Sequence, residues 1–223
     1  MQEWFIWDNK TLIQDHVYVL HDFLQPDIYD QLKHEIRTAP NEWHNRYASR
    51  LIAENVRSPM VMELGARLLP YLSSLFHQQF CVATAKIYID LSGSSMFPHF
   101  DDRNFAVSMQ LYMPDVDCPE LGTKFCFNNQ LNQLIENEPD RLLDYKFQMT
   151  SDSDCSSPVA FCSNNGYINF NNKPVRTLHK TLPVPAGYIR ESLHYNFNIK
   201  QQHLLGLEGV HYARLQQQEA SKS

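Results

Sequence analysis

A series of short strand-like segments, joined mostly by turns, is the feature that most constrains how this chain can fold. The segments occupy residues 82–91, 105–113, 124–127, 166–170, 176–180 and 188–199. Turn signals such as Ser92-Gly93-Ser94 and Pro185-Ala186-Gly187 stand between them. Many short strands with few intervening helices predict a sandwich or a barrel, so the fold class is mostly β.

The first of two helical patterns covers residues 27–37. It follows Pro26, a residue favoured at the start of a helix. Its apolar residues Ile28, Leu32 and Ile36 recur every four positions, which places them on one face. The pattern predicts an amphipathic helix that packs against a core.

A second helix is expected to begin at Ser58, because serine is a good N-cap and Pro59 suits the first helical position. The helix should run towards Phe76, and Pro70 inside it predicts a kink or a break. Residues 41–57, between the two helices, are expected to form a loop with an extended piece.

The length of 223 residues suits one domain with a full core. We expect a single domain over residues 1–223. Within it, residues 1–80 supply N-terminal strands and supporting helices, residues 81–200 form the β core, and residues 201–223 form a C-terminal tail. Residues 128–158 interrupt the series of strands as an insertion, which is a candidate lid.

The formal net charge of −6 and the lack of any run of Lys or Arg argue against a binder of duplex nucleic acid, which needs a basic face. The first five residues have neither a basic nor an apolar signal-peptide region, and no apolar stretch is long enough to span a bilayer. We therefore expect a cytoplasmic protein without a membrane or nucleic-acid partner. The sequence leaves the oligomeric state open.

The five cysteines are scattered and include no Cys-x-x-Cys pair. We interpret them as buried or free thiols in a reducing compartment. They are Cys81, Cys118, Cys126, Cys155 and Cys162.

The sharpest local motif is His99-Phe100-Asp101. In an extended segment, residues two apart point the same way, so His99 and Asp101 can reach one ion. A second histidine, His179, follows far downstream. Two imidazoles and one carboxylate form the facial triad typical of non-haem iron(II) oxygenases. Asp102 competes with Asp101 for this role, but its side chain should point away from His99.

The strand expected after His179 begins with Arg190-Glu191-Ser192. Alternation puts Arg190 and Ser192 on one face, where a guanidinium beside a hydroxyl can hold a carboxylate. His194 and Asn196 continue this polar row. We interpret the row as the lining of an interior cavity, with solvent as the alternative. His194 is also a rival third metal ligand.

The stretch from about residue 80 to 200 resembles the 2-oxoglutarate- and iron(II)-dependent oxygenase superfamily, particularly its prolyl-hydroxylase-like branch. The pieces that carry the resemblance are His99-Phe100-Asp101, Leu111-Tyr112-Met113-Pro114, Leu121-Gly122-Thr123-Lys124-Phe125, Gly166-Tyr167-Ile168-Asn169-Phe170, Leu178-His179-Lys180-Thr181, Pro183-Val184 and Arg190-Glu191-Ser192. One departure is Leu121-Gly122, where the family usually has two glycines.

The resemblance implies a double-stranded β-helix, a cupin-like jelly-roll barrel buttressed by helices. It implies Fe(II) held by His99, Asp101 and His179, with 2-oxoglutarate and O2 as co-substrates. The distal carboxylate of 2-oxoglutarate would pair with Arg190 and Ser192, with Tyr88 as a further hydrogen-bonding residue. The implied reaction is hydroxylation of a C–H bond in an amino-acid side chain, peptidyl or free, or in a small metabolite, with release of succinate and CO2. The presence of Asp101 favours hydroxylation over halogenation.

Two other readings stay open. A cupin-like metal-binding barrel would bind a ligand or carry out non-oxidative chemistry, and a catalytically silent jelly roll would act as an interaction module. Alternation along the expected strands also makes Gln110, Tyr112 and Asn169 candidates for inward-facing residues.

Overall fold

The computed structural model describes residues 3–14, 16–46, 49–54, 56, 58–101, 104–126, 155–171 and 177–200. Predictions for Asp102, for most of the insertion at 128–158 and for the tail at 201–223 lie outside these residues. Within the described residues, no helix combines the length and the apolar character that a membrane crossing requires.

Both predicted helices are present, as α1 (Pro26–Thr38) and α2 (Pro59–Phe76). The Ser58 side chain caps α2 by accepting a hydrogen bond from the backbone N–H of Val61. The sequence predicted a kink or a break at Pro70. The helix continues through this residue, so no break occurs. The buried residues of α2 pack into the main core on both sides of Pro70, which offsets the hydrogen bond that proline removes.

The strands form two antiparallel sheets, one with the order β1-β2-β9-β7-β11-β5-β4-β3 and one with the order β6-β10-β8. Their bounds are β1 (Lys10–Gln14), β2 (Val17–Leu20), β3 (Trp43–Arg46), β4 (Arg50–Glu54), β5 (Phe80–Asp90), β6 (Met96–His99), β7 (Val107–Tyr112), β8 (Thr123–Cys126), β9 (Gly166–Phe170), β10 (Leu178–Thr181) and β11 (Arg190–Ile199). The mostly β fold class is therefore confirmed.

The hairpin of β3 and β4 falls where the sequence predicted a loop with one extended piece. Its strands are only four and five residues long, and the apolar residues of β4 are consecutive (Leu51, Ile52 and Ala53), so neither strand shows period-two alternation. Pairing of β4 with β5, which sets Arg50 opposite Asp90, attaches the hairpin to the large sheet. Strands from before residue 80 thus belong to the same sheet as β5, β7, β9 and β11.

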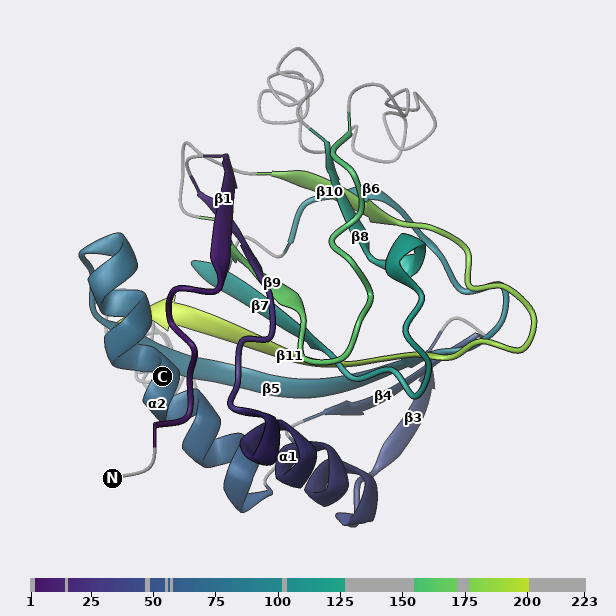
Figure 1. Ribbon diagram of the computed structural model, residues 1–223, viewed down its shortest axis with the longest axis horizontal. Coiled ribbons are helices and arrows are strands. Elements are labelled where there is room, and N and C mark those ends of the chain that lie inside the picture. Colours follow the sequence, from purple (N-terminus) through teal and green to yellow (C-terminus); the bar gives the residue numbers. More distant parts are fainter. Residues whose placement is uncertain are drawn as a thin grey trace, which may run out of the picture.

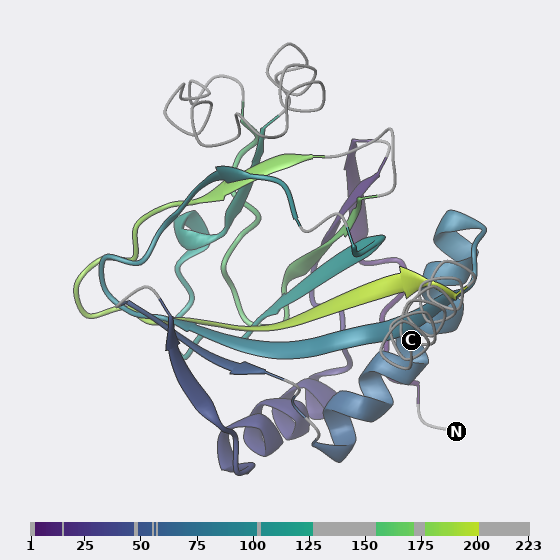
Figure 2. The ribbon, with the colours of Figure 1, turned by 180° about the vertical axis from the view of Figure 1, so that it is seen from behind.

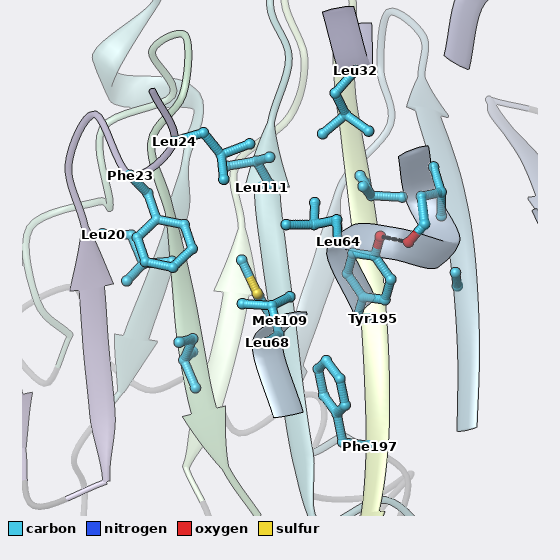
Figure 3. Packing of buried hydrophobic residues seen from close by; sticks show 14 of the residues in the cluster. Leu20, Phe23, Leu24, Leu32, Leu64, Leu68, Met109, Leu111, Tyr195 and Phe197 are labelled. Carbon is cyan, nitrogen blue, oxygen red and sulfur yellow. Dashed lines mark hydrogen bonds between the residues drawn. The ribbon is translucent and has the colours of Figure 1, made fainter. Parts of the chain in front are cut away.

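The large sheet has different neighbours on its two faces (Figure 1). Helices α1 and α2 lie along one face, and the sheet of β6, β10 and β8 lies on the side opposite the helices, as the reverse view also shows (Figure 2). Alternation along β11 sends Leu193, Tyr195 and Phe197 into the core that contains the helices. Figure 3 shows Tyr195 beside Leu64 of α2, and the Tyr195 hydroxyl donates a 2.6 Å hydrogen bond to the Val61 carbonyl.

The other face of β11 carries the polar row predicted from the sequence. Ser192, His194 and Asn196 are all buried, and the last two lie opposite Gln110 and Ser108 of β7. The polar side chains therefore face the interior of the molecule and not the solvent. The alternative of a solvent-facing row is therefore wrong for these three residues, although of the row only Arg190 and His194 line the cavity described below.

The prediction of free thiols is wrong for two of the five cysteines. Cys126 and Cys155 form a disulfide, whereas Cys81, Cys118 and Cys162 are free. Cys126 ends β8 and forms an isolated antiparallel bridge with Cys155, which brings their Cα atoms to 4.0 Å. The 29-residue separation of the two cysteines conceals this proximity in the sequence.

Candidate metal centre

The small sheet brings the three predicted ligands together. His99 ends β6, and His179 lies opposite it on the antiparallel strand β10. Asp101 follows β6 by two residues, and its Oδ1 lies 3.5 Å from His179 Nε2. One ligand atom from each of the three side chains falls within 4.8 Å of the others, so the three can hold one ion. The structure therefore assembles the group that the His-x-Asp motif and His179 predicted.

Hydrogen bonds fix which ring nitrogen of each histidine faces the centre. His99 Nδ1 lies 2.8 Å from the Phe97 carbonyl oxygen, and His179 Nδ1 lies 3.3 Å from the Thr177 carbonyl oxygen. A carbonyl only accepts, so each Nδ1 carries the hydrogen and each Nε2 keeps a lone pair. Anchoring of the second ring nitrogen by a carbonyl is the usual support of a metal-binding histidine.

Two asparagine side chains hold the Asp101 carboxylate by one oxygen. Asp101 Oδ2 accepts hydrogen bonds from Asn169 Nδ2 at 3.4 Å and from Asn171 Nδ2 at 3.3 Å. Asn169 Nδ2 also donates to Asn171 Oδ1 at 2.8 Å, and Asn171 Nδ2 donates to Ser108 Oγ at 3.0 Å. This network leaves Asp101 Oδ1 facing His179. Asn169 was a sequence candidate, whereas Asn171 lies beyond the predicted strand and was missed.

The electrostatics hold His99 and Asp101 in the protonation states that metal binding requires. Burial, followed by the charge of His179, lowers the pKa of His99 to about 4. Burial opposes the ionisation of Asp101, but the three histidines His179, His194 and His99 outweigh it and hold the pKa of Asp101 well below its usual value. At neutral pH His99 is therefore neutral and Asp101 is ionised, as ligands must be.

A cavity of about 90 Å³ opens beside these three residues. Its walls come from both sheets, and they include Tyr88 and Arg190 of the predicted site. Gln110 and His194 of the polar row also line it, and the ring of His194 meets that of Tyr88 edge-on at 5.5 Å. Burial lowers the pKa of His194 to about 4, so this imidazole is neutral as well.

Other predicted residues take part differently. Ser192 is buried and accepts a 2.7 Å hydrogen bond from Gln110 Nε2, and it is not among the residues that line the cavity. The Tyr112 hydroxyl donates a 3.0 Å hydrogen bond to Thr123 Oγ1. His194 lines the cavity but does not belong to the three-ligand group.

Six residues that line the cavity were not among the site residues predicted from the sequence, namely Arg50, Asp90, Met96, Thr123, Tyr167 and Thr181. Arg50 lies on β4, a segment that was expected to be mostly loop, so no local signal pointed to it. Asp90 and Thr181 carried a usable signal, because each lies two residues beyond a predicted site residue, Tyr88 or His179, on the same strand.

No protein-family model and no curated protein sequence matches this chain. Solved structures do match it, and they define the class of fold. HygX from Streptomyces hygroscopicus, with nickel and 2-oxoglutarate bound, has a TM-score of 0.61 and 13% identity, over 87% of this chain and 85% of HygX. A Pseudomonas putida prolyl-4-hydroxylase has a TM-score of 0.56 and 16% identity, over 83% of this chain and 93% of its own.

A prolyl hydroxylase from Trichoplax adhaerens, in complex with a hypoxia-inducible-factor peptide, matches with a TM-score of 0.57 and 11% identity, over 86% of this chain and 87% of its own. At such low identities these likenesses show the fold alone. The chain therefore has the jelly-roll fold seen in 2-oxoglutarate and iron(II) oxygenases, and the chemistry must be argued from its own side chains.

Proposed function

We propose that this protein is an Fe(II)- and 2-oxoglutarate-dependent dioxygenase. It hydroxylates a C–H bond of an amino-acid side chain, peptidyl or free, or of a small metabolite, and releases succinate and CO2. The observation that carries the proposal is the group of His99, Asp101 and His179, whose ligand atoms converge to within 4.8 Å beside a cavity.

The donor set fits iron(II). Two imidazole nitrogens and one carboxylate oxygen on one side of an ion form the facial triad, which leaves the opposite positions open. His99 and His179 present Nε2 because their Nδ1 atoms donate to backbone carbonyls, and Asp101 presents Oδ1 because two asparagines hold Oδ2. Bound Fe(II), 2-oxoglutarate and O2 would together supply an oxidant strong enough to take hydrogen from an unactivated C–H bond.

The cavity also fits a small acid. A volume of about 90 Å³ is well below the 300–1,000 Å³ of pockets for drug-sized ligands, so the cavity suits a small co-substrate. Two guanidinium groups, Arg50 and Arg190, face a single carboxylate, Asp90, at one side of the cavity. The surplus positive charge would attract the distal carboxylate of 2-oxoglutarate, which supports the choice of co-substrate.

Solved structures with this fold hold both a small molecule and a peptide, which supports leaving both kinds of substrate in the proposal. HygX has also been solved with the small molecule hygromycin B, and the Trichoplax enzyme was solved with a peptide. SnoN, a non-haem α-ketoglutarate-dependent epimerase, matches this chain with a TM-score of 0.57 and 11% identity, over 82% of this chain and 78% of its own. Incorporation of oxygen from 18O2 into the product would separate hydroxylation from epimerisation.

The proposal is tested by adding Fe(II) and 2-oxoglutarate to the protein without oxygen. A visible charge-transfer absorption should appear, and admission of air should release succinate. His179→Ala and Asp101→Ala should abolish both signals, whereas His34→Ala, a change on the exposed side of α1, should preserve them.

The outcomes separate the competing readings. Stoichiometric iron without succinate would favour the cupin-like barrel with a ligand-binding or non-oxidative role. Absence of bound iron from the wild-type protein would favour a catalytically silent interaction module.

A further inference from the structure

Two arginines from different strands share one buried carboxylate at the wall of the cavity. Arg190 of β11 donates to Asp90 Oδ2 through Nε at 2.9 Å and through Nη2 at 2.8 Å. Arg50 of β4 donates to Asp90 Oδ1 through Nε and to Oδ2 through Nη2 at 2.9 Å. Asp90 is only 3% exposed, and β5 pairs with both β4 and β11 to set the three residues side by side.

Every N–H group of the Arg190 guanidinium donates a hydrogen bond within the protein. Besides the two bonds to Asp90, Nη1 donates to the carbonyls of Leu121 and Leu182, each at 3.1 Å, and Nη2 donates to Thr181 Oγ1 at 3.0 Å. These five bonds account for all five N–H groups of an arginine. Binding of a ligand carboxylate by Arg190 would require the breaking of a fully hydrogen-bonded buried pair, which is costly.

The Arg50 guanidinium is only partly used. Its remaining hydrogen bond within the described residues runs from Nη1 to the Met96 thioether at 2.9 Å, and a thioether is a weak acceptor. One N–H on each terminal nitrogen therefore has no partner in the part of the chain that the structure describes. Such a pair of N–H groups matches the two oxygens of a carboxylate.

Arg50 also lies in the right place. It lines the same cavity as His99 and His179, and its guanidinium carbon lies 5.0 Å from the centre of the Tyr88 ring.

A hydroxyl donor completes this wall of the cavity. Thr181 Oγ1 accepts hydrogen bonds from Arg190 Nη2 and from the backbone N–H of Met96, both at 3.0 Å. With its oxygen engaged twice as an acceptor, the hydroxyl hydrogen remains to be donated. Thr181 lines the cavity together with Arg50.

Resting on the proposed function, we propose that Arg50 and Thr181 bind the distal carboxylate of the 2-oxo acid, and that Arg190 and Asp90 form the buried support that holds Arg50 in place. Arg50 of β4 and Thr181 of β10 thus take the binding role that the sequence analysis expected of Arg190 and Ser192. Asp90 orients Arg50 by accepting from one edge of its guanidinium, and the other edge is left for the ligand.

The test is an anaerobic titration of the Fe(II) protein with 2-oxoglutarate and, separately, with pyruvate, a 2-oxo acid without a distal carboxylate. Each acid is followed by its charge-transfer absorption. Arg50→Gln should weaken 2-oxoglutarate binding by about 10-fold or more, which is the loss expected for hydrogen bonds to a charged group. The affinity of Arg50→Gln for pyruvate should stay unchanged. The affinity of Arg50→Lys for 2-oxoglutarate should fall between those of the wild type and Arg50→Gln.

Two control variants accompany this titration. Arg67→Gln changes an arginine of α2 that pairs with Glu63 away from the cavity, and it should alter neither affinity. Arg190→Lys should lower the melting temperature, while the protein that remains folded keeps its preference for 2-oxoglutarate over pyruvate.

The outcomes distinguish this proposal from the proposed function. If the wild-type protein shows no charge-transfer absorption with either acid, the proposed function fails and this inference falls with it. If the wild-type protein binds 2-oxoglutarate but Arg50→Gln binds it equally well, or loses both acids to the same extent, only the role of Arg50 is overturned.

Discussion

His99 and His179 lie directly opposite each other on the paired strands β6 and β10, and their ring centroids are 4.3 Å apart. The spacing of the two imidazoles is thus set by strand pairing and not by a loop. β10 also pairs with β8 on its other side, where Cys126 lies opposite Leu178, the residue before His179. The disulfide is therefore one strand away from the metal centre.

The hydrogen bonds beneath Asp101 predict a loss of metal affinity when they are removed. Asn171→Ala should weaken Fe(II) binding about 10- to 100-fold, because loss of an outer partner of a metal ligand typically costs that much. Competition with a chromophoric chelator measures the affinity. Asn41→Ala removes a similar hydrogen bond, to the Ile36 carbonyl near the end of α1, and should leave the affinity unchanged. Equal affinities for the wild type and Asn171→Ala would contradict a positioning role.

The buried neutral histidines predict that the metal-free protein loses stability in acid. The pKa of His194 is about 4 in the fold, and an unfolded histidine has a pKa of about 6.5. Between these values the unfolded chain binds more protons, so the free energy of unfolding falls as pH drops from about 6.5 to 4. For His194 the loss at pH 5 is about 2 kcal/mol.

Denaturant unfolding of wild type and His194→Gln at pH 7 and pH 5 measures this effect. The variant should lose less stability between the two pH values than the wild type, because one of the titrating groups is gone. His99, whose pKa is also about 4, should continue to destabilise the variant in the same window. An identical loss in both proteins would show that His194 does not titrate as described.

The disulfide predicts a redox-dependent stability. Cys126→Ser should lower the free energy of unfolding by about 3 kcal/mol, because the cross-link restricts the unfolded chain over a 29-residue separation. Addition of reductant should destabilise the wild-type protein to a similar extent and leave Cys126→Ser unaffected. Cys162→Ser, at a free cysteine, serves as the matched control and should respond to reductant as the wild type does.

A close backbone approach at Gly122 predicts that this position tolerates no side chain. A Cβ atom there would lie 1.5 Å from the Val159 carbonyl oxygen, and the Val159 N–H is itself bonded to the Thr123 carbonyl at 2.9 Å. Gly122→Ala should therefore cost on the order of 3 kcal/mol, since backbone must move.

Gly187→Ala provides the comparison for this prediction. Gly187 has a φ of 83° with nothing near its Cβ position, so the substitution adds backbone strain without a clash and should cost about 1–2 kcal/mol. Thermal unfolding of the two variants ranks them. A smaller loss for Gly122→Ala than for Gly187→Ala would contradict the close approach.

Local patterns were enough to predict several elements closely. Apolar spacing and the Ser58-Pro59 start predicted both helices, and period-two alternation predicted β7, β9 and β11 to within a few residues. The β3–β4 hairpin could not be predicted in the same way. Its short strands lack period-two alternation and depend on pairing with β5, a long-range contact that leaves no local mark.

The sequence by itself determined which side chains are available for chemistry and which way they face. Alternation at period two is a local property of extended backbone, so it predicted that His99 and Asp101, and likewise Arg190 and Ser192, point the same way before any partner was known. This local rule also indicated that the polar side of β11 would differ from its apolar side.

Only the tertiary structure decided what those side chains meet. The register of β10 against β6 brings His179 to His99. The register of β5 against β4 and β11 sets both Arg190 and Arg50 opposite Asp90, and all three residues line the cavity. Such partners come from strands far apart in the chain. Their meeting depends on sheet order and register, which arise from the packing of the whole fold and not from any segment alone.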